Sequence, residues 1–203
     1  MPDAPAGLSS IYVVRHGETE WSLTGRHTGR TDVPLTLAGE GQAAGLRKYL
    51  AGIEFSWVAS SPLARAVGTC KLAGFDTPEL IDDLMEWDYG DYEGMTLSQI
   101  HQSRPDWNLW VDGAPGGEGV ADVDKRADRM LELLQGKQGN VLVFSHGHFL
   151  RVLAARWLAL EVSGGRLFAL QPAAVSVLGF EHGNPVISMW NMVGTMSAGS
   201  RLS

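Results

Sequence analysis

The sequence has a single cysteine and no concentration of basic residues. Cys70 stands alone among 203 residues, which excludes an internal disulfide framework, and we expect its thiol to be buried and inert. The formal net charge is −7 and the pI is about 5.3. Because an acidic chain without a Lys/Arg run binds polyanions poorly, we expect neither a nucleic-acid partner nor a membrane surface.

Long hydrophobic runs are also missing. No stretch approaches the roughly 20 apolar residues that cross a bilayer, and Met1 to Ser10 lacks the pattern of a signal peptide, so we expect a cytoplasmic protein. With no internal repeat or low-complexity linker, we predict a single domain over residues 8–196 and flexible ends at 1–7 and 197–203. The oligomeric state stays open, and a homodimer is one state that the sequence allows.

Apolar, β-branched runs alternate with helical patterns along the chain. The expected strands are Ile11–Val14, Trp57–Ala59 and Val141–Phe144, and two extended runs around residues 182–185 read as a hairpin. The expected helices run from the N-cap Thr36 to about Leu50, from Pro62 onward, over Val120–Leu134 and over Phe149–Leu160. This alternation predicts an α/β fold in three layers (α/β/α), with a mostly parallel central sheet and helices on both faces.

The motif that points to function is Arg15-His16-Gly17, which follows the first predicted strand. Histidine serves as a nucleophile and arginine presents a planar fork of donors to phosphate oxygens, so their adjacency indicates phosphoryl chemistry without a metal. A second histidine, His146, follows another apolar strand in the same way. Because ligands bind beyond the carboxyl ends of strands in α/β sheets, we expect both imidazoles at one edge.

Arg65 is a third candidate, in the segment 61–66 between a predicted strand and a predicted helix. The free backbone N–H groups of a helix start and a nearby guanidinium make an anion site. Taken alone, an arginine in a first helical turn is usually solvated. Together with Arg15, it would clamp the non-bridging oxygens of a transferring phosphoryl group.

An acidic and aromatic segment, residues 84–94, supplies candidate proton donors. Displacing an alcohol from a phosphate ester requires a proton for the leaving oxygen, which a carboxyl group that stays protonated near neutral pH would provide. The spacing does not choose among Glu86, Asp88 and Glu93. Without such a role, this segment is a solvated turn.

The motifs together resemble the histidine phosphatase superfamily, the phosphoglycerate-mutase-like fold, in its cofactor-dependent branch. The resemblance spans about Ile11 to Trp190 and rests on five motifs in order: 15–21, 28–29 with 32–36, 61–66, 86–94 and 145–147. It implies that His16 is the phosphorylated nucleophile, Glu86 the general acid, and Arg15, Arg65 and His146 the phosphate pocket. It further implies phosphate or substrate contacts from Gly17, Ser22, Thr28, Gly29, Tyr89 and Gly147.

The mechanism that this resemblance implies has two in-line displacements. Neutral His16 attacks phosphorus while Glu86 protonates the departing oxygen, and Glu86 then takes a proton from the water that hydrolyses the phosphohistidine. We expect nearby cations to keep His16 neutral and a backbone carbonyl to fix its tautomer. No metal and no other cofactor is implied, and a rate optimum on the acid side of neutrality is expected.

Hydrolysis is favoured over isomerisation by two departures from the mutase pattern. Mutases of this family carry asparagine where this chain has Ser22, and they have a basic segment after the general-acid motif, whereas residues 92–110 contain only Arg104 apart from histidine. We therefore predict a phosphomonoesterase for small phosphorylated metabolites, similar to broad-specificity acid phosphatases and the sedoheptulose-bisphosphatase branch. The alternatives are a 2,3-bisphosphoglycerate-dependent phosphoglycerate mutase and, less favoured, a non-catalytic binder of phosphorylated ligands.

The remaining histidines and two tryptophans have structural interpretations. We expect His148 to begin a helix, and a zinc pair made of His146 and His148 lacks a nearby third ligand. Trp107 and Trp110 either cover the substrate as a lid or, at helical spacing, pack in the core. The other histidines are expected to be surface or structural residues: His27, His101 and His182.

Overall fold

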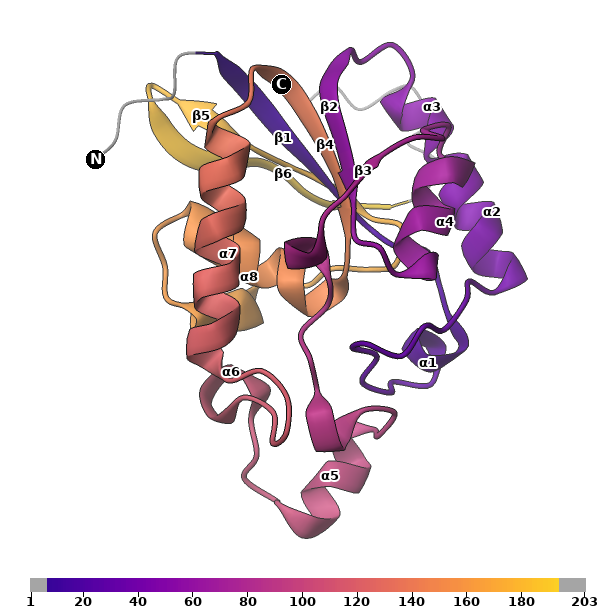
Figure 1. Cartoon of the computed structure of the whole chain (residues 1–203), viewed down its shortest axis with the longest axis vertical. Helices are drawn as coiled ribbons and strands as arrows, with labels where there is room; N and C mark the ends of the chain where they lie inside the picture. The colour runs from indigo at the N-terminus through magenta and orange to yellow at the C-terminus, as the bar shows by residue number, and fades with distance from the viewer. Residues whose placement is uncertain (1–6, 194–203) are drawn as a thin grey trace, which may run out of the picture.

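The computed structural model describes residues 7–193, and within them six strands form one mixed sheet (Figure 1). The predicted flexible ends lie outside the described residues, except for Gly7. In sequence order the strands are β1 (Leu8–Arg15), β2 (Phe55–Ser60), β3 (Glu79–Leu80), β4 (Gly139–Ser145), β5 (Val175–Glu181) and β6 (Asn184–Met192). Their order in the sheet is β3-β2-β4-β1-β5-β6. The first four are parallel neighbours, and the predicted hairpin β5–β6 adds an antiparallel edge, so the mostly parallel sheet is confirmed.

Helices cover both faces of this sheet, as predicted for three layers. Figure 1 shows α7 and α8 on one side and α2, α3 and α4 on the other. The α-helices are α1 (Glu20–Leu23), α2 (Leu37–Gly45), α3 (Arg47–Leu50), α4 (Ala64–Leu72), α5 (Leu97–Ser103), α6 (Leu109–Asp112), α7 (Val120–Gln135) and α8 (Gly147–Trp157). The 3₁₀ helices are η1 (Asp82–Leu84), η2 (Gly90–Tyr92) and η3 (Val162–Leu167). In the described part of the chain, no helix is long and apolar enough to span a bilayer.

The two central strands are buried on both faces, which explains why they read as unbroken apolar runs. In β4, Val141 and Val143 pack into the cluster that holds the apolar side chains of α7 and α8. Leu142 and Phe144 pack on the opposite face, with side chains from α3 and α4. Successive side chains of a strand point to opposite faces, so a helical layer on each face makes every position apolar.

The predicted helices are confirmed, with shifted ends. Thr36 caps α2 with its side chain, but the helix stops at Gly45 and continues as the separate α3. The helix expected from Pro62 begins at Ala64. Helix α8 was predicted over Phe149–Leu160, but it begins two residues earlier, at Gly147, and ends three residues earlier, at Trp157. The elements α1 and β3 are four and two residues long, too short to produce a periodic pattern.

Trp107, Trp110 and Cys70 are buried. The two tryptophans are 4% and 9% exposed and belong to the apolar cluster beneath α7 and α8, so they form core and not a lid. The Cys70 thiol donates to the carbonyl of Phe75, and burial raises its pKa to about 12. Because the thiolate is the reactive form, this thiol is inert at neutral pH, as predicted.

Candidate active site

The two motif histidines meet where the parallel strands β1 and β4 end. Arg15 of β1 lies opposite Ser145 of β4, so the next residue of each chain segment leaves the sheet at the same edge. The N–H of His16 donates to the Ser145 carbonyl over 2.9 Å, and the ring centres of His16 and His146 lie 5.1 Å apart. The predicted meeting of the two imidazoles is confirmed.

His16 is held in the form of a nucleophile. Its Nδ1 lies 2.7 Å from the Gly17 carbonyl and donates to it, so Nε2 keeps its lone pair, and the predicted carbonyl contact is confirmed. Burial, with the positive charges of Arg65 and Arg15, lowers the pKa of His16 well below 6.5. Gly17 permits this packing, because a Cβ there would lie 2.5 Å from the Gly39 carbonyl oxygen.

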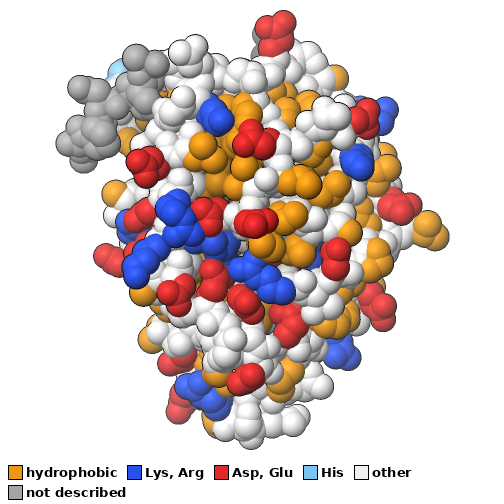
Figure 2. All heavy atoms as spheres, viewed as in Figure 1, with side chains coloured by type: hydrophobic (Ala, Val, Ile, Leu, Met, Phe, Trp, Pro, Cys, Tyr) orange, Lys and Arg blue, Asp and Glu red, His pale blue; other side chains and the backbone are white. Residues whose placement is uncertain are grey.

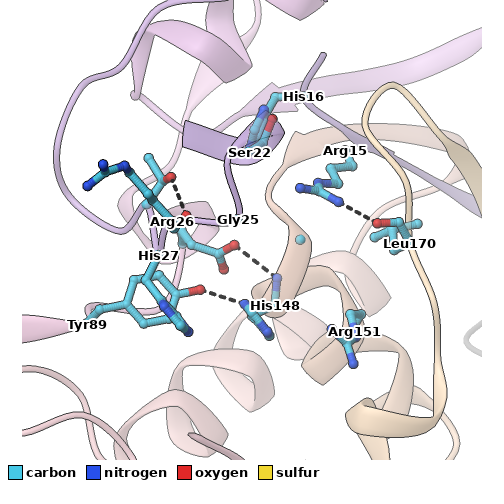
Figure 3. A pocket seen from close by; sticks show the side chains of 13 residues that line it. Arg15, His16, Ser22, Gly25, Arg26, His27, Tyr89, His148, Arg151 and Leu170 are labelled. Atoms are coloured by element: carbon cyan, nitrogen blue, oxygen red, sulfur yellow. Dashed lines mark hydrogen bonds between the residues drawn. The ribbon is translucent and has the colours of Figure 1, made fainter. Parts of the chain in front are cut away.

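A cavity of about 190 Å³ opens beside His16 (Figure 3). Its lining residues come from the end of β1, the segment 22–28, the general-acid motif and helix α8: Arg15, His16, Ser22, Gly25, Arg26, His27, Thr28, Glu86, Tyr89, Gly147, His148, Arg151 and Leu170. Drug-sized ligands occupy pockets of about 300–1,000 Å³. The cavity therefore suits a small metabolite.

Arg15 presents unused donors to this cavity. Its Nη1 donates to the Leu170 carbonyl, while its Nε is buried with no partner among the described residues. A Cβ on Gly147 would lie 3.2 Å from this Nε, so glycine lets the guanidinium pack closely against the start of α8. Since an arginine side chain stays protonated, an unsatisfied buried guanidinium marks a place for an anion.

Arg65 and His146 lie behind the cavity wall. Arg65 is fully buried, so the interpretation as a solvated arginine is wrong. Its Nε donates to His146 Nδ1 over 3.1 Å, and its Nη groups donate to carbonyls of residues 28–31, leaving one Nη1 hydrogen without a partner within residues 7–193. His146 Nε2–H donates to Ser61 Oγ over 2.8 Å. Burial and the charge of Arg65 lower the pKa of His146 well below 6.5, so this imidazole is neutral.

Glu86 caps the start of helix α8. Its Oε1 accepts the N–H groups of Trp87 and Phe149 over 2.9 and 2.8 Å, and its Oε2 accepts the N–H of His148 over 2.9 Å. The side chain is 5% exposed and lines the cavity. Because Oε2 receives one backbone bond and Oε1 receives two, Oε2 is the oxygen with room for a proton or a substrate atom.

The other two candidate acids are used elsewhere. Asp88 lies 3.6 Å from the Arg30 guanidinium and accepts the N–H of Gly90. Glu93 accepts the N–H groups of Gly29 and Thr31, which fixes the loop beneath Arg65. Of these three acids, Glu86 is the one that lines the cavity, so it is the acid placed to reach a ligand there.

The residues expected to contact phosphate or substrate divide into two groups. Ser22, Thr28, Tyr89 and Gly147 line the cavity, whereas Gly17 and Gly29 do not. The expected contact from Gly29 is corrected, because Glu93 takes its N–H and Arg65 takes its carbonyl. The Ser22 hydroxyl is part of a cap at the start of α1, where it donates to the Thr19 carbonyl and accepts the Thr19 N–H.

Four lining residues with polar or charged side chains were not predicted as site residues from the sequence: Arg26, His27, His148 and Arg151. His148 does begin α8, as predicted, but its Nδ1 also lies 2.6 Å from the Tyr89 hydroxyl, and its ring stacks with that of His27 at 6.3 Å. His148 and Arg151 are three residues apart on a helix that starts beside His16. Their i, i+3 spacing is the signal that would have placed them on one face.

No group of three or more His, Cys, Asp or Glu side chains within residues 7–193 is arranged to hold a metal ion. The two histidines of the possible zinc pair have different partners. His146 bonds Ser61 and Arg65, and His148 bonds Tyr89. Both histidines therefore have protein partners of their own.

Arg126 on α7 holds the Glu86 segment against the core. It is 4% exposed, lies over the Phe149 ring at 4.3 Å, and contacts the Glu118 carboxylate with Nε at 2.8 Å and Nη2 at 2.7 Å. Its Nη1 donates to the carbonyls of Asp83 and Met85, and its Nη2 to that of Glu86. A single buried side chain thus anchors the backbone that carries the candidate acid.

Arg126→Met is expected to lower the free energy of unfolding by about 3–5 kcal/mol, because it removes the close partner of the largely buried Glu118 carboxylate and leaves that carboxylate with Arg30 at 3.7 Å. The matched control is Arg129→Met. Arg129 pairs with Asp83 and is 58% exposed. Figure 2 shows that basic side chains lie next to acidic ones on the face of the molecule turned to the viewer. Urea denaturation of both variants measures the difference, and equal midpoints for the two would contradict a supporting role for Arg126.

The chain is similar in sequence to a known family and to several known proteins. The family model described as "Histidine phosphatase superfamily (branch 1)" matches residues 11–193. An acid phosphatase of Mycobacterium tuberculosis is 43% identical over 188 residues, which cover 91% of this chain and 93% of the relative. A sedoheptulose 1,7-bisphosphatase of Saccharomyces cerevisiae is 35% identical, with 78% of this chain and 70% of the relative covered.

A mutase and a solved structure also match. A 2,3-bisphosphoglycerate-dependent phosphoglycerate mutase of Mesorhizobium japonicum is 34% identical, with 77% of this chain and 83% of the relative covered. The solved structure of an open reading frame product of Mycobacterium tuberculosis superposes with a TM-score of 0.88 at 42% identity, covering 92% of this chain and 99% of that one.

Proposed function

The chain belongs to the histidine phosphatase superfamily, branch 1, and from this premise we propose that it is a phosphomonoesterase that acts through a phosphohistidine on small phosphorylated metabolites. It would need neither a metal nor another cofactor. The observation that carries the proposal is the state of His16, which is neutral, has Nε2 free and lies beside the unsatisfied guanidinium of Arg15. A small cavity in front of it has room for a metabolite.

In the first displacement, Nε2 of His16 attacks phosphorus and the bond from phosphorus to the leaving oxygen breaks. Glu86 transfers a proton from Oε2 to that oxygen, and the alcohol departs. The free donors of Arg15 bind the non-bridging oxygens, and the positive charge of Arg65 behind the cavity wall adds to the stabilisation of their charge. Neutral His146 fixes Arg65 through the bond from Arg65 Nε.

In the second displacement, a water molecule attacks the phosphorus of the phosphohistidine. Glu86 takes the proton from that water, the bond between phosphorus and Nε2 breaks, and inorganic phosphate leaves. Glu86 is then protonated and His16 neutral, so the cycle restores its starting state. Both steps use the same donors, because the phosphoryl oxygens stay near Arg15 throughout.

A phosphoglycerate mutase is the second candidate, since a mutase is among the similar proteins. Against it stands Ser22, whose hydroxyl is tied into the cap of α1 instead of being free for a second substrate group. A mutase would isomerise phosphoglycerate faster than it hydrolyses it when primed with 2,3-bisphosphoglycerate. Hydrolysis that exceeds isomerisation under those conditions supports the phosphatase.

The direct test is hydrolysis of p-nitrophenyl phosphate in the presence of a chelator. We expect full activity in EDTA, inhibition by vanadate, and a maximum of kcat/KM below pH 7. The acid optimum is expected because the lowered pKa of His16 keeps this nucleophile neutral below pH 7, and acid favours proton donation to the leaving oxygen. A requirement for a divalent metal, or a maximum above pH 8, would overturn the proposal.

A further inference from the structure

The outer part of the cavity is lined by two arginines whose charge has no carboxylate partner within residues 7–193. Arg26 and Arg151 line it and form no ion pair among the described residues, whereas other arginines, such as Arg126 and Arg156, contact carboxylates. The one carboxylate in the lining, Glu86, already accepts three N–H groups. In a chain of net charge −7, this leaves uncompensated positive charge in the cavity.

Arg151 is fixed so that one end of its guanidinium remains available. Its Nε donates to the Gly165 carbonyl over 3.0 Å, its Nη2 donates to the Arg166 carbonyl over 3.3 Å, and its guanidinium lies 4.6 Å from the Trp110 ring centre. Nη1 has no partner within residues 7–193. Such a preorganised group binds an anion with little loss of side-chain entropy.

His148 provides a second donor near Arg151. Burial and the charge of Arg151 lower the pKa of His148 well below 6.5, so its ring is neutral. The Tyr89 hydroxyl lies 2.6 Å from Nδ1, and burial raises the pKa of this phenol, so it keeps its proton and is assigned as the donor to Nδ1. The proton of the neutral ring is then on Nε2, which is an unpaired donor.

Helix α8 sets the distance between the reacting centre and this pair of donors. His146 is the N-cap of the helix, and Arg151 follows it by five residues, or about 7.5 Å along the axis. Figure 3 shows Arg151 and His148 on one side of the cavity and His16 on the other. A small molecule with two anionic groups would span this distance.

Resting on the proposed function, we propose that Arg151, with the Nε2–H of His148, binds a second anionic group of the substrate while its phosphate lies at His16. The preferred substrates are then small phosphomonoesters that carry a carboxylate or a second phosphate. The scarcity of cations in residues 92–110 does not exclude such substrates, because the cation comes from α8 instead.

Matched substrate pairs test this inference. The first pair is 3-phosphoglycerate and glycerol 3-phosphate, which differ by a carboxylate, and the second is fructose 1,6-bisphosphate and fructose 1-phosphate, which differ by a phosphate. We expect Arg151→Gln to lower kcat/KM by about 10- to 100-fold for the member that carries the second anionic group, mainly through KM, as for the loss of a charge-assisted hydrogen bond. The kcat/KM for p-nitrophenyl phosphate, which lacks a second anionic group, should fall by less than this. The pair that shows the larger effect identifies the second group as a carboxylate or a phosphate.

The matched control is Arg166→Gln, which removes an equal charge from an exposed side chain that does not line the cavity. In each substrate pair, Arg166→Gln should leave unchanged the ratio of kcat/KM between the member with the second anionic group and the member without it. If Arg151→Gln lowers turnover of both members of each pair equally, or of neither, the inference is wrong. An equal loss would mean that Arg151 only supports η3 through its bonds to Gly165 and Arg166.

Calorimetry in a His16→Ala background separates this inference from the proposed function, because it measures affinity without turnover. We expect the ligand with the second anionic group in the responsive pair to bind at least about 10-fold more tightly than the ligand without it, and Arg151→Gln to remove that difference. If the affinities differ in this way but the original protein hydrolyses no substrate, the proposed phosphatase function is wrong and the second anion site is supported. If the original protein hydrolyses substrate but the two affinities are equal, the phosphatase function is supported and the second anion site is wrong.

Discussion

Replacing His16 by alanine is expected to lower kcat/KM for every phosphomonoester by on the order of 10⁴-fold or more, because the covalent route is then lost as a whole. The original protein mixed with ³²P-labelled substrate and quenched in alkali should retain label, since a phosphoramidate bond survives base and breaks in acid. The variant should retain none. The loss of rate tests His16 as the nucleophile, and the retained label tests the phosphohistidine intermediate.

The control for this prediction is His182→Asn. His182 is exposed in the turn between β5 and β6, where its φ of 50° is one that asparagine also adopts. This variant should keep both the rate and the label. Circular dichroism must show that the His16 variant is folded. If a folded His16→Ala protein still forms an alkali-stable phosphoenzyme, another residue is the nucleophile.

The fold was predictable because its central strands carry a strong signal. A strand covered on both faces has no polar positions, and the runs 11–14 and 141–144 show this pattern. From it follow the parallel pairing of β1 with β4 and the meeting of His16 with His146. The edge strand β3, which is two residues long and exposed, has no such pattern and was missed.

The inner part of the site was predictable for the same reason, and the outer part was not. His16 and His146 directly follow buried strands, so topology places them. Arg26 and His27 lie in an irregular loop whose path depends on contacts distant in the sequence, such as those of His27 with Met95 and of Arg26 with Gly94. A single sequence contains no periodic signal for such contacts.

Arg65 shows how context overrides a residue's usual preference. Arginines in first helical turns are mostly solvated, yet this one is completely buried and its donors are taken up by backbone carbonyls and His146. The loop 28–31 supplies those carbonyls, and Glu93 holds that loop by its N–H groups. Glu93, one of the acids considered as a proton donor, therefore acts on the site through Arg65.

Glu86 has to serve as an acid while it caps a helix. Three backbone N–H groups fix its carboxyl group, so its orientation changes little between the two displacements. The group must give a proton to the leaving oxygen and then take one from water. A glutamine has the same shape and keeps an oxygen acceptor for the N–H groups at the start of α8, but it neither gives a proton nor takes one. Glu86→Gln therefore separates the capping of the helix from proton transfer.

Glu86→Gln is expected to lower the rate of phosphoenzyme formation from an alkyl phosphate such as glycerol 3-phosphate by about 10²- to 10⁴-fold, the usual contribution of a general acid. With p-nitrophenyl phosphate the leaving group departs as a stable anion, so the first turnover should slow by less than about tenfold. Steady-state turnover should still fall, because the attacking water has lost its base. Stopped-flow measurements should therefore show a burst of nitrophenolate followed by a slow phase.

The control for Glu86→Gln is Asp91→Asn, an exposed acid in the same segment that does not line the cavity, and it should leave both phases unchanged. Equal losses for alkyl and aryl phosphates in the first turnover would mean that Glu86 only positions the start of α8. A large loss for the alkyl ester alone assigns the proton to Glu86, because the two substrates differ in whether their leaving oxygen needs one.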